Sequence, residues 1–98
     1  MESILEEALR IRSGERNADY GDAVENFRRI AEITTAISGI PVTPELCCYV
    51  HIATKQSRER HNHKRDNLVD LCGYADILNR INDAHHADDS EEQGPAVE

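Results

Sequence analysis

Apolar residues recur at intervals of three or four along the chain as far as Ile81, and no segment shows the strict alternation of a half-buried strand. This spacing predicts amphipathic helices. The first opens with the capping box Ser3-Ile4-Leu5-Glu6 and stops at Gly14. The second opens at the capping sequence Asp22-x-x-Glu25 and ends at Gly39. Its expected apolar face consists of Phe27, Ile30, Ile33 and Ile37.

Two further helices follow. Thr43-Pro44-Glu45 combines an N-cap, a proline at the first helical position and an early acid, and so predicts a helix from there to about residues 58–60. The fourth helix is expected from near Asp66 to about Ile81. Residues 82–98 are polar and charged, which predicts a disordered acidic tail. The fold class is therefore all-α: a four-helix bundle-like domain over residues 1–81, followed by the tail over 82–98.

The composition limits what this domain can be. The chain has 98 residues, 4% of them aromatic, and no Trp, so its core is thin. Small helical domains with thin cores often gain stability by association, which predicts a homodimer. The three cysteines include no C-x-x-C pair, which favours buried reduced thiols in a cytoplasmic protein. No apolar stretch approaches the ~20 residues of a membrane span, so no membrane partner is expected.

Charge is distributed unevenly. The formal net charge is −8, and six of the acids lie in the tail, which has no Lys or Arg. The remaining 13 acids and 11 bases nearly cancel. A basic segment over residues 55–65 contains one acid, Glu59. Because the acidic tail opposes contact with phosphate backbones, specific nucleic-acid binding is not expected.

Polar residues in the second helix and before it stand out. At about 100° per residue, Asn26 falls near the middle of the expected apolar face. The preceding segment Asp19-Tyr20-Gly21 enters the N-terminus of this helix, which favours anions. One interpretation is an ordinary turn whose backbone Asn26 satisfies. The other is a pocket wall, in which Tyr20 or Phe27 stacks on a base and Gly21 lets the backbone approach it.

The fourth helix is apolar on both sides, which predicts a central position. Asp66 and Asp70 lie one turn apart on its second side, near Gly73. A glycine inside a helix costs about 1 kcal/mol relative to alanine, so Gly73 suggests close approach by a helix or a ligand. The two acids are either an N-cap and a solvated or ion-paired carboxylate, or a pair of Mg²⁺ ligands.

The third helix carries a complementary face. His51, Lys55 and Arg58 share one side of it at i, i+4 and i+7. In one interpretation Lys55 lays its stem over apolar neighbours and pairs with Asp70 or Glu59. In the other, Lys55 and Arg58 bind phosphate beside acids that hold Mg²⁺.

Three stretches between residues 3 and 81 carry a resemblance: "GERNADYGDAVENFRRIAEI", "TPELCCYVHIATKQSR" and "KRDNLVDLCGYADI". They resemble a family of small phage and prophage proteins with a D-Y-G loop, a K-x-x-R helix and the motif D-N-x-V-D-x-x-G-Y. These proteins are in turn distantly similar to MazG-like all-α nucleoside triphosphate pyrophosphohydrolases. The resemblance implies a helical dimer in the cytoplasm of the bacterial host that binds a nucleotide, or another phosphate-bearing small molecule, with Mg²⁺. The last motif adds Asn67 and Tyr74 to the candidate ligand-binding residues.

Whether such a protein turns its ligand over is left open. MazG-type sites present E-x-x-E on one helix and E-x-x-D on the next, whereas this chain offers Asn67-x-x-Asp70 with Asp66 beside it. The leading hypothesis is a nucleotide-binding phage protein that acts as a Mg²⁺-dependent pyrophosphohydrolase. The alternatives are a non-enzymatic nucleotide sponge and a structural dimerisation module. The candidate metal ligands are Asp66 and Asp70, and the candidate ligand-binding residues are Asp19, Tyr20, Gly21, Asn26, Phe27, Lys55, Arg58, Asn67 and Tyr74.

Overall fold

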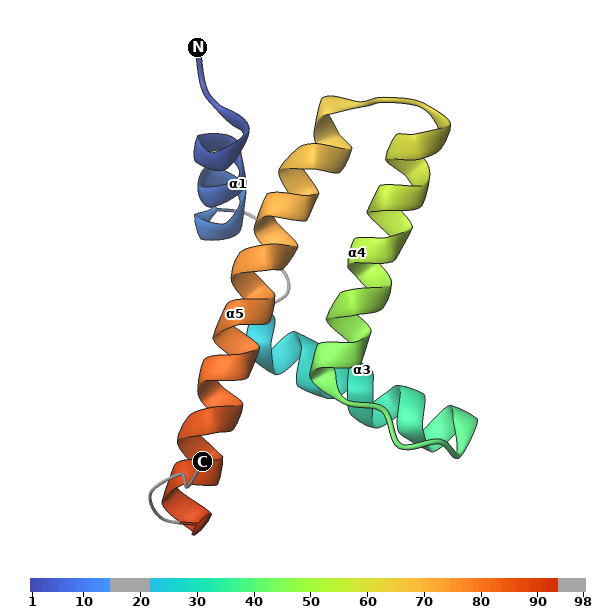
Figure 1. Ribbon diagram of the computed structural model, residues 1–98, viewed down its shortest axis with the longest axis vertical. Coiled ribbons are helices and arrows are strands. Elements are labelled where there is room, and N and C mark those ends of the chain that lie inside the picture. Colours follow the sequence, from blue (N-terminus) through green and yellow to red (C-terminus); the bar gives the residue numbers. More distant parts are fainter. Residues whose placement is uncertain (15–21, 94–98) are drawn as a thin grey trace.

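The computed structural model describes residues 1–14 and 22–93, with side chains described as far as His86. Within these residues the chain forms helices and no strand, so the predicted all-α fold class is confirmed (Figure 1). The helices are α1 (Ile4–Ser13), α3 (Ala23–Ser38), α4 (Pro44–His61) and α5 (Arg65–Gln93).

The predicted helix starts are confirmed by their hydrogen bonds. At α1 the Ser3 hydroxyl accepts from the Glu6 amide at 3.1 Å, while the Glu6 carboxylate accepts from the Ser3 amide at 3.0 Å. The Thr43 hydroxyl accepts from the Leu46 amide at 3.1 Å at the start of α4. Each contact satisfies an amide that has no partner inside the helix, which is why capping sequences locate helix starts well.

The end of α3 is also as predicted. Gly39 has φ 73°, in the left-handed region that a residue with a side chain rarely adopts, and its amide donates to the Thr35 carbonyl at 2.9 Å. The Thr35 hydroxyl then accepts from the Val42 amide at 2.9 Å. These bonds turn the chain sharply back into α4.

The predicted end of the last helix near Ile81 was wrong. In the structure α5 continues to Gln93, so the disordered tail expected from residue 82 is not confirmed. The reason is local, because residues 82–93 contain alanines and, at their end, Glu91, Glu92 and Gln93, which are good helix formers. The first Gly-Pro pair that stops a helix comes only at residues 94–95.

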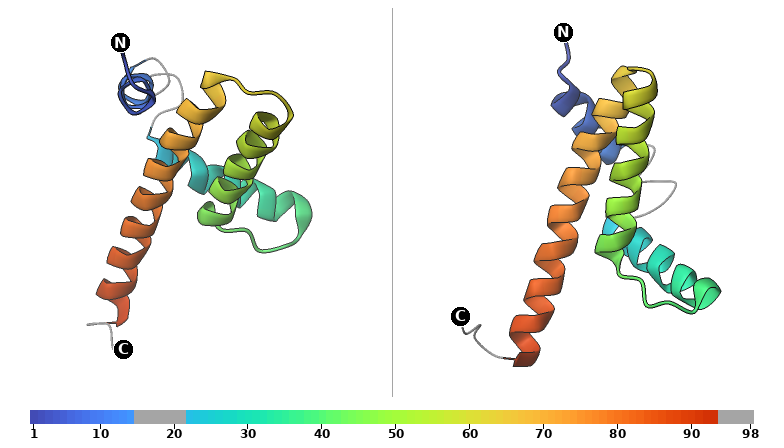
Figure 2. Two further views of the ribbon diagram at one scale, coloured as in Figure 1. Left: turned by 45° about the horizontal axis from the view of Figure 1, so that its top comes forward. Right: turned by 45° about the vertical axis from the view of Figure 1, so that its right-hand side comes forward.

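Helix α5 is the central element. It contacts all three other helices, and α3 also contacts α4. Figures 1 and 2 show α4 and α5 as an antiparallel hairpin, with α1 beside the first half of α5 and α3 crossing one end of the hairpin. This arrangement explains why the sequence of α5 is apolar on more than one side.

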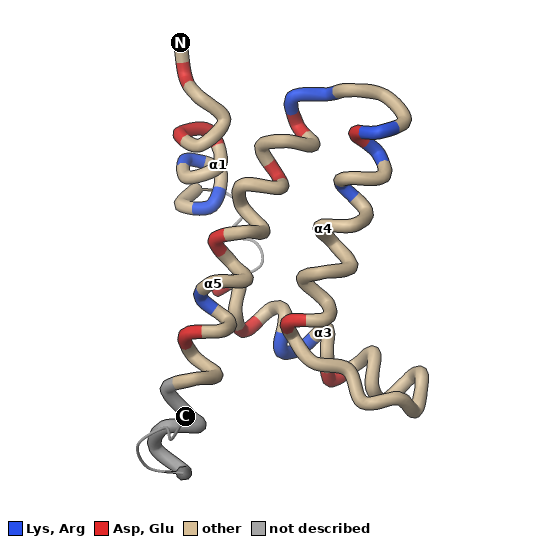
Figure 3. Tube along the Cα trace, viewed as in Figure 1, with Lys and Arg blue, Asp and Glu red and all other residues tan. Residues whose placement is uncertain are grey.

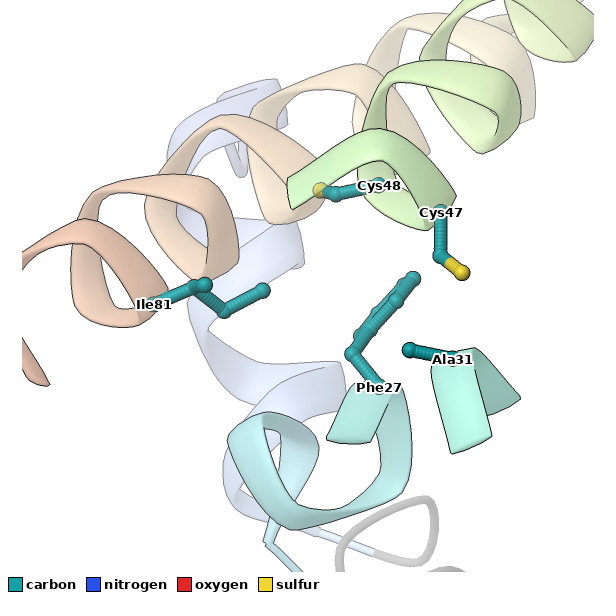
Figure 4. Packing of buried hydrophobic residues seen from close by; sticks show 5 residues of the cluster. All are labelled: Phe27, Ala31, Cys47, Cys48 and Ile81. Carbon is teal, nitrogen blue, oxygen red and sulfur yellow. The ribbon is translucent and has the colours of Figure 1, made fainter. Parts of the chain in front are cut away.

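The core lies where α3, α4 and α5 meet. Phe27 and Ala31 from α3 pack against Cys47, Cys48 and Ile81 (Figure 4). Val69 of α5 is buried as well. The expected apolar face of α3 is only half used, because Ile33 and Ile37 remain 58% and 81% exposed. In Figure 1 the C-terminal end of α3 projects beyond α4 and α5, in keeping with this exposure.

The described cysteines are free thiols, as predicted. Cys48 is fully buried, and this burial, with a smaller contribution from neighbouring Cys47, raises its pKa to about 11. Cys72 is only half-buried. None of the helices in the described residues is both long enough and apolar enough to cross a membrane.

We predict that a thiolate-specific reagent at pH 8 modifies Cys72 first and leaves Cys48 unmodified in the folded protein. The thiolate is the reactive form, and a pKa of about 11 leaves about one Cys48 in a thousand ionised at that pH. Mass spectrometry after timed labelling measures this order. Protein unfolded in urea is the control, in which all three cysteines react. Equal rates for Cys48 and Cys72 in the folded protein would contradict the described core.

Candidate functional site

The side chain of Lys55 joins the two helices of the hairpin. Its Nζ lies 2.6 Å from Asp70 Oδ2 and 3.3 Å from Asp66 Oδ2. The Lys55 and Asp70 side chains are 13% and 8% exposed, whereas Asp66 is 70% exposed. The hydrogen bond to Asp70 raises the pKa of Lys55, and Asp66 adds to this effect. Lys55 therefore carries its charge at neutral pH, and its contribution to stability is lost only above its usual titration range.

This arrangement does not fit a magnesium site. A divalent cation held by Asp66 and Asp70 would have to displace the Lys55 ammonium, which both carboxylates already contact. Mg²⁺ also requires near-octahedral oxygen ligands. Among the described residues no cluster of three His, Cys, Asp or Glu side chains is placed to hold a metal. The geometry corresponds to the ion-pair interpretation of the sequence.

A second polar cluster closes the turn between α4 and α5. Glu59 Oε1 accepts from the Lys64 amide at 3.0 Å and from Asn67 Nδ2 at 3.2 Å, and the other Glu59 oxygen contacts His63. The bond to His63, followed by that to the Lys64 amide, lowers the pKa of Glu59. Asn67 is 4% exposed, so its amide is already engaged in this cluster. Arg58 is exposed on α4. Nothing in the sequence pattern predicts this role of Glu59, because its partners gather only when the chain turns between α4 and α5.

Phe27 lies in an aromatic cluster and not on an open surface. Its ring packs edge-on against His51 at 5.0 Å and against Tyr74 at 6.4 Å, and His51 and Tyr74 are 5.4 Å apart. One ring comes from each of α3, α4 and α5. Phe27 is 3% exposed, so the structure leaves its ring little room to stack on a base. The spacing along one helix could not reveal this cluster, because each helix contributes a single ring.

The predicted pocket wall is only partly visible. Asn26 is half-buried, and its Oδ1 lies 3.5 Å from Arg29 Nη2 on the same helix. The buried residues of α3 are Phe27 and Ala31. Asn26 therefore does not lie in the middle of the buried face. Asp19, Tyr20 and Gly21 lie outside the described residues.

A groove runs between α1 and α5. It is shallow, with a cavity volume of about 30 Å³, and is lined by Ala8, Ile11, Arg12, Val69, Asp70, Gly73, Tyr74 and Ile77. An adjacent hollow shares Ala8, Arg12 and Gly73 with it and adds Cys72. Asp70 and Tyr74, two site residues predicted from the sequence, thus line the same groove. Lys55 does not line it but contacts Asp70.

Gly73 lines this groove. A Cβ built at Gly73 meets no atom of the described residues within 4 Å, so none of the described helices approaches it closely, and the expectation of close approach by a helix was wrong. Helix α1 is joined to α5 by two ion pairs: Arg65 bonds Glu7 at 3.0 Å, and Arg12 pairs with Asp76. No residue of α1 is buried. The cost of a helical glycine is thus not explained by packing between the helices.

We predict that Lys55→Met lowers the free energy of unfolding by about 3–5 kcal/mol, because it removes the ammonium group that neutralises the buried Asp70 carboxylate. The double variant Lys55→Met, Asp70→Leu should recover most of this loss, because two apolar side chains replace the ion pair. Urea denaturation followed by circular dichroism measures both. A double variant as unstable as the single one would show that the pair is not the principal interaction of either side chain.

Comparison with known proteins places the chain in a family. The pattern described as "Domain of unknown function (DUF6378)" matches residues 3–82. The Gene 55 protein of Mycobacterium phage L5 is 41% identical over 81 residues, which cover 81% of this chain and 52% of that protein. The Gene 55 protein of Mycobacterium phage D29 is 41% identical over 85 residues, which cover 82% of this chain and 54% of that protein.

The chain thus spans about half the length of these curated relatives. No solved structure matches it. The predicted relation to phage proteins is confirmed by both relatives. Since the family pattern runs from the cap of α1 past the buried Ile81 of α5, this chain belongs to the DUF6378 family.

Proposed function

We propose that this protein binds a nucleotide, or a similar phosphate-bearing small molecule, in the groove between α1 and α5, without a bound metal ion and without hydrolysing it. The observation that carries the proposal is Gly73. It lies inside α5 at a cost of about 1 kcal/mol, and the described fold does not need the space it leaves. That space lies in the groove, beside Asp70 and Tyr74.

The walls of the groove suit such a ligand. The half-buried Ile11 and Ile77 provide apolar surface for a base, and the half-buried Tyr74 lines the same groove. Arg12 lines both the groove and the hollow next to it, and its side chain is 31% exposed. A guanidinium has five N–H donors, so it can bind a phosphate while it remains paired with Asp76.

Charge in the groove also favours an anion over a metal. Its two nearby acids are neutralised, Asp70 by Lys55 and Asp76 by Arg12. A phosphate therefore does not meet an unpaired carboxylate there. The same pairing argues against a hydrolytic Mg²⁺ centre at Asp66 and Asp70. We therefore favour a non-enzymatic nucleotide-binding protein over a hydrolase. The relation to MazG-like pyrophosphohydrolases stays a prediction.

We predict that at least one nucleotide raises the melting temperature of the protein equally in EDTA and in Mg²⁺, and that it is recovered intact by chromatography. A ligand at a hundred times its Kd adds about 2.7 kcal/mol, or a shift of about 10 °C or more for a domain of this size. The panel is the common ribonucleoside and deoxyribonucleoside triphosphates and cyclic nucleotides. Mg²⁺-dependent cleavage would instead support the hydrolase. No shift with any nucleotide would overturn the proposal.

We also predict that Gly73→Ala raises the melting temperature of the free protein and reduces the shift produced by the nucleotide. The methyl group clashes with nothing and improves helix propensity by about 1 kcal/mol, but it occupies part of the groove. Ser57→Ala, at an exposed position of α4, is the matched control that improves propensity away from the groove. A nucleotide response of Gly73→Ala equal to that of Ser57→Ala would place the ligand elsewhere.

A further inference from the structure

Helix α1 is the least anchored helix of the described fold. Among the described helices it contacts α5 alone, whereas α3 and α4 also contact each other. None of its residues is buried, while each of the other three helices contributes buried residues to the structure. Its inner face, Ile4, Ala8 and Ile11, is only half-buried. Apolar burial therefore holds α1 to α5 less firmly than it holds α3, α4 and α5 together.

The seam between α1 and α5 is also incompletely filled. The groove and the adjacent hollow have cavity volumes of about 30 Å³ and 190 Å³, and both are lined by Ala8, Arg12 and Gly73. A Cβ built at Gly73 meets no atom of the described residues within 4 Å. Protein interiors are normally close-packed, so the two helices lose little packing when they part along this seam.

Polar contacts supply the other links across the seam. Arg65 bonds the Glu7 carboxylate at 3.0 Å and donates to the Glu2 carbonyl at 2.8 Å, and Arg12 pairs with Asp76. The side chains of the two ion pairs are between 24% and 48% exposed, and ion pairs that water reaches contribute little to stability. Figure 3 shows acidic and basic positions along α1 and along the first half of α5.

The groove as it stands is too small for the ligand proposed above. A cavity volume of about 30 Å³ holds about two water molecules, whereas sites for small-molecule ligands enclose about 300–1,000 Å³. Helix α5 is fixed, because Asp70 pairs with Lys55 of α4 and Ile81 is buried in the core. Space for a ligand must therefore come from a movement of α1.

We propose that α1 is a movable cover of the groove: it separates from α5 as a unit while α3, α4 and α5 stay packed, and the ligand binds in this separated state. Segments with few buried contacts open at a lower free energy than the core of the same protein. The separation of α1 follows from its own packing and does not depend on a ligand. The second half, ligand binding in the separated state, rests on the proposed function.

Arg65 controls how often the cover opens. It holds the start of α1 through two bonds, and it lines neither the groove nor the hollow. When only a small separated fraction of the protein binds ligand, the observed Kd is the intrinsic Kd divided by that fraction. A substitution that opens α1 more often therefore lowers the observed Kd by the same factor.

Labelling of the full chain with a bulky maleimide measures the separation, because Cys72 lines the hollow between α1 and α5. Cys48 is the internal control, since it is buried in the core and reacts only when the whole protein unfolds. We expect Arg65→Gln to raise the rate of Cys72 labelling about two- to fivefold and to leave Cys48 unlabelled. Arg60→Gln, the matched control, removes the same charge at an exposed position in the last turn of α4 and should behave as the wild type.

Calorimetric titration with the nucleotide that raises the melting temperature most tests the second half. We expect its Kd to be lower in Arg65→Gln than in Arg60→Gln by the factor found for Cys72 labelling. Glu7→Gln, which breaks the same ion pair from α1, serves if Arg65→Gln does not fold.

Two results would overturn the proposal. One is a Cys72 labelling rate that Arg65→Gln leaves unchanged, or that rises only together with labelling of Cys48. The other is a nucleotide Kd that does not fall although Cys72 labelling is faster, because the ligand would then not require the separated state. If no nucleotide binds, the ligand-binding half fails together with the proposed function, and the labelling rates alone decide whether α1 separates.

Discussion

The contact between Lys55 and Asp70 links α4 and α5, the two longest helices, and the packing of the other helices depends on how these two are aligned. It is nearly buried, so each charge depends on the other for the stabilisation that water would otherwise give. It fixes the register of the α4–α5 hairpin one turn from the Glu59 cluster that closes the turn. With the register set, Cys48 and Ile81 face α3, and Phe27 completes the core.

The same contact limits the chemistry that the molecule can perform. The sequence suggested that Lys55 binds phosphate and that Asp66 and Asp70 bind a metal ion. In the structure the Lys55 ammonium lies between these two carboxylates. A carboxylate that neutralises a lysine is a poor starting point for a divalent cation, because the lysine must first leave. The described residues offer a groove with apolar walls and an arginine, and it is there that we propose a phosphate-bearing ligand binds without an activated water.

The protein has a small core and also leaves several large apolar side chains exposed. The small side chains of the core allow α3, α4 and α5 to approach closely, but they bury little area. Large apolar side chains elsewhere remain exposed: Ile33 and Ile37 on α3, and Leu46, Tyr49 and Val50 on α4. In a domain of this size these exposed apolar side chains add nothing to the burial that holds the described helices together.

The sequence by itself determined the helices. Ser3, Asp22, Thr43 and Gly39 act through hydrogen bonds to their near neighbours or through their own backbone angles, so their effect does not depend on the rest of the fold. The sequence also identified Lys55 and Asp70 as charged residues with apolar neighbours and Gly73 as a glycine inside a helix. Polarity alone does not predict the end of α5, because good helix formers carry the helix through a charged segment to Gln93. Only the tertiary structure decided which partners the polar residues take. It paired Lys55 with both acids, and it gave Asn67 to Glu59. It also brought Phe27, His51 and Tyr74 together from three helices. Such contacts join residues far apart in the chain, and their distances depend on how the helices cross, which no periodicity within one helix records.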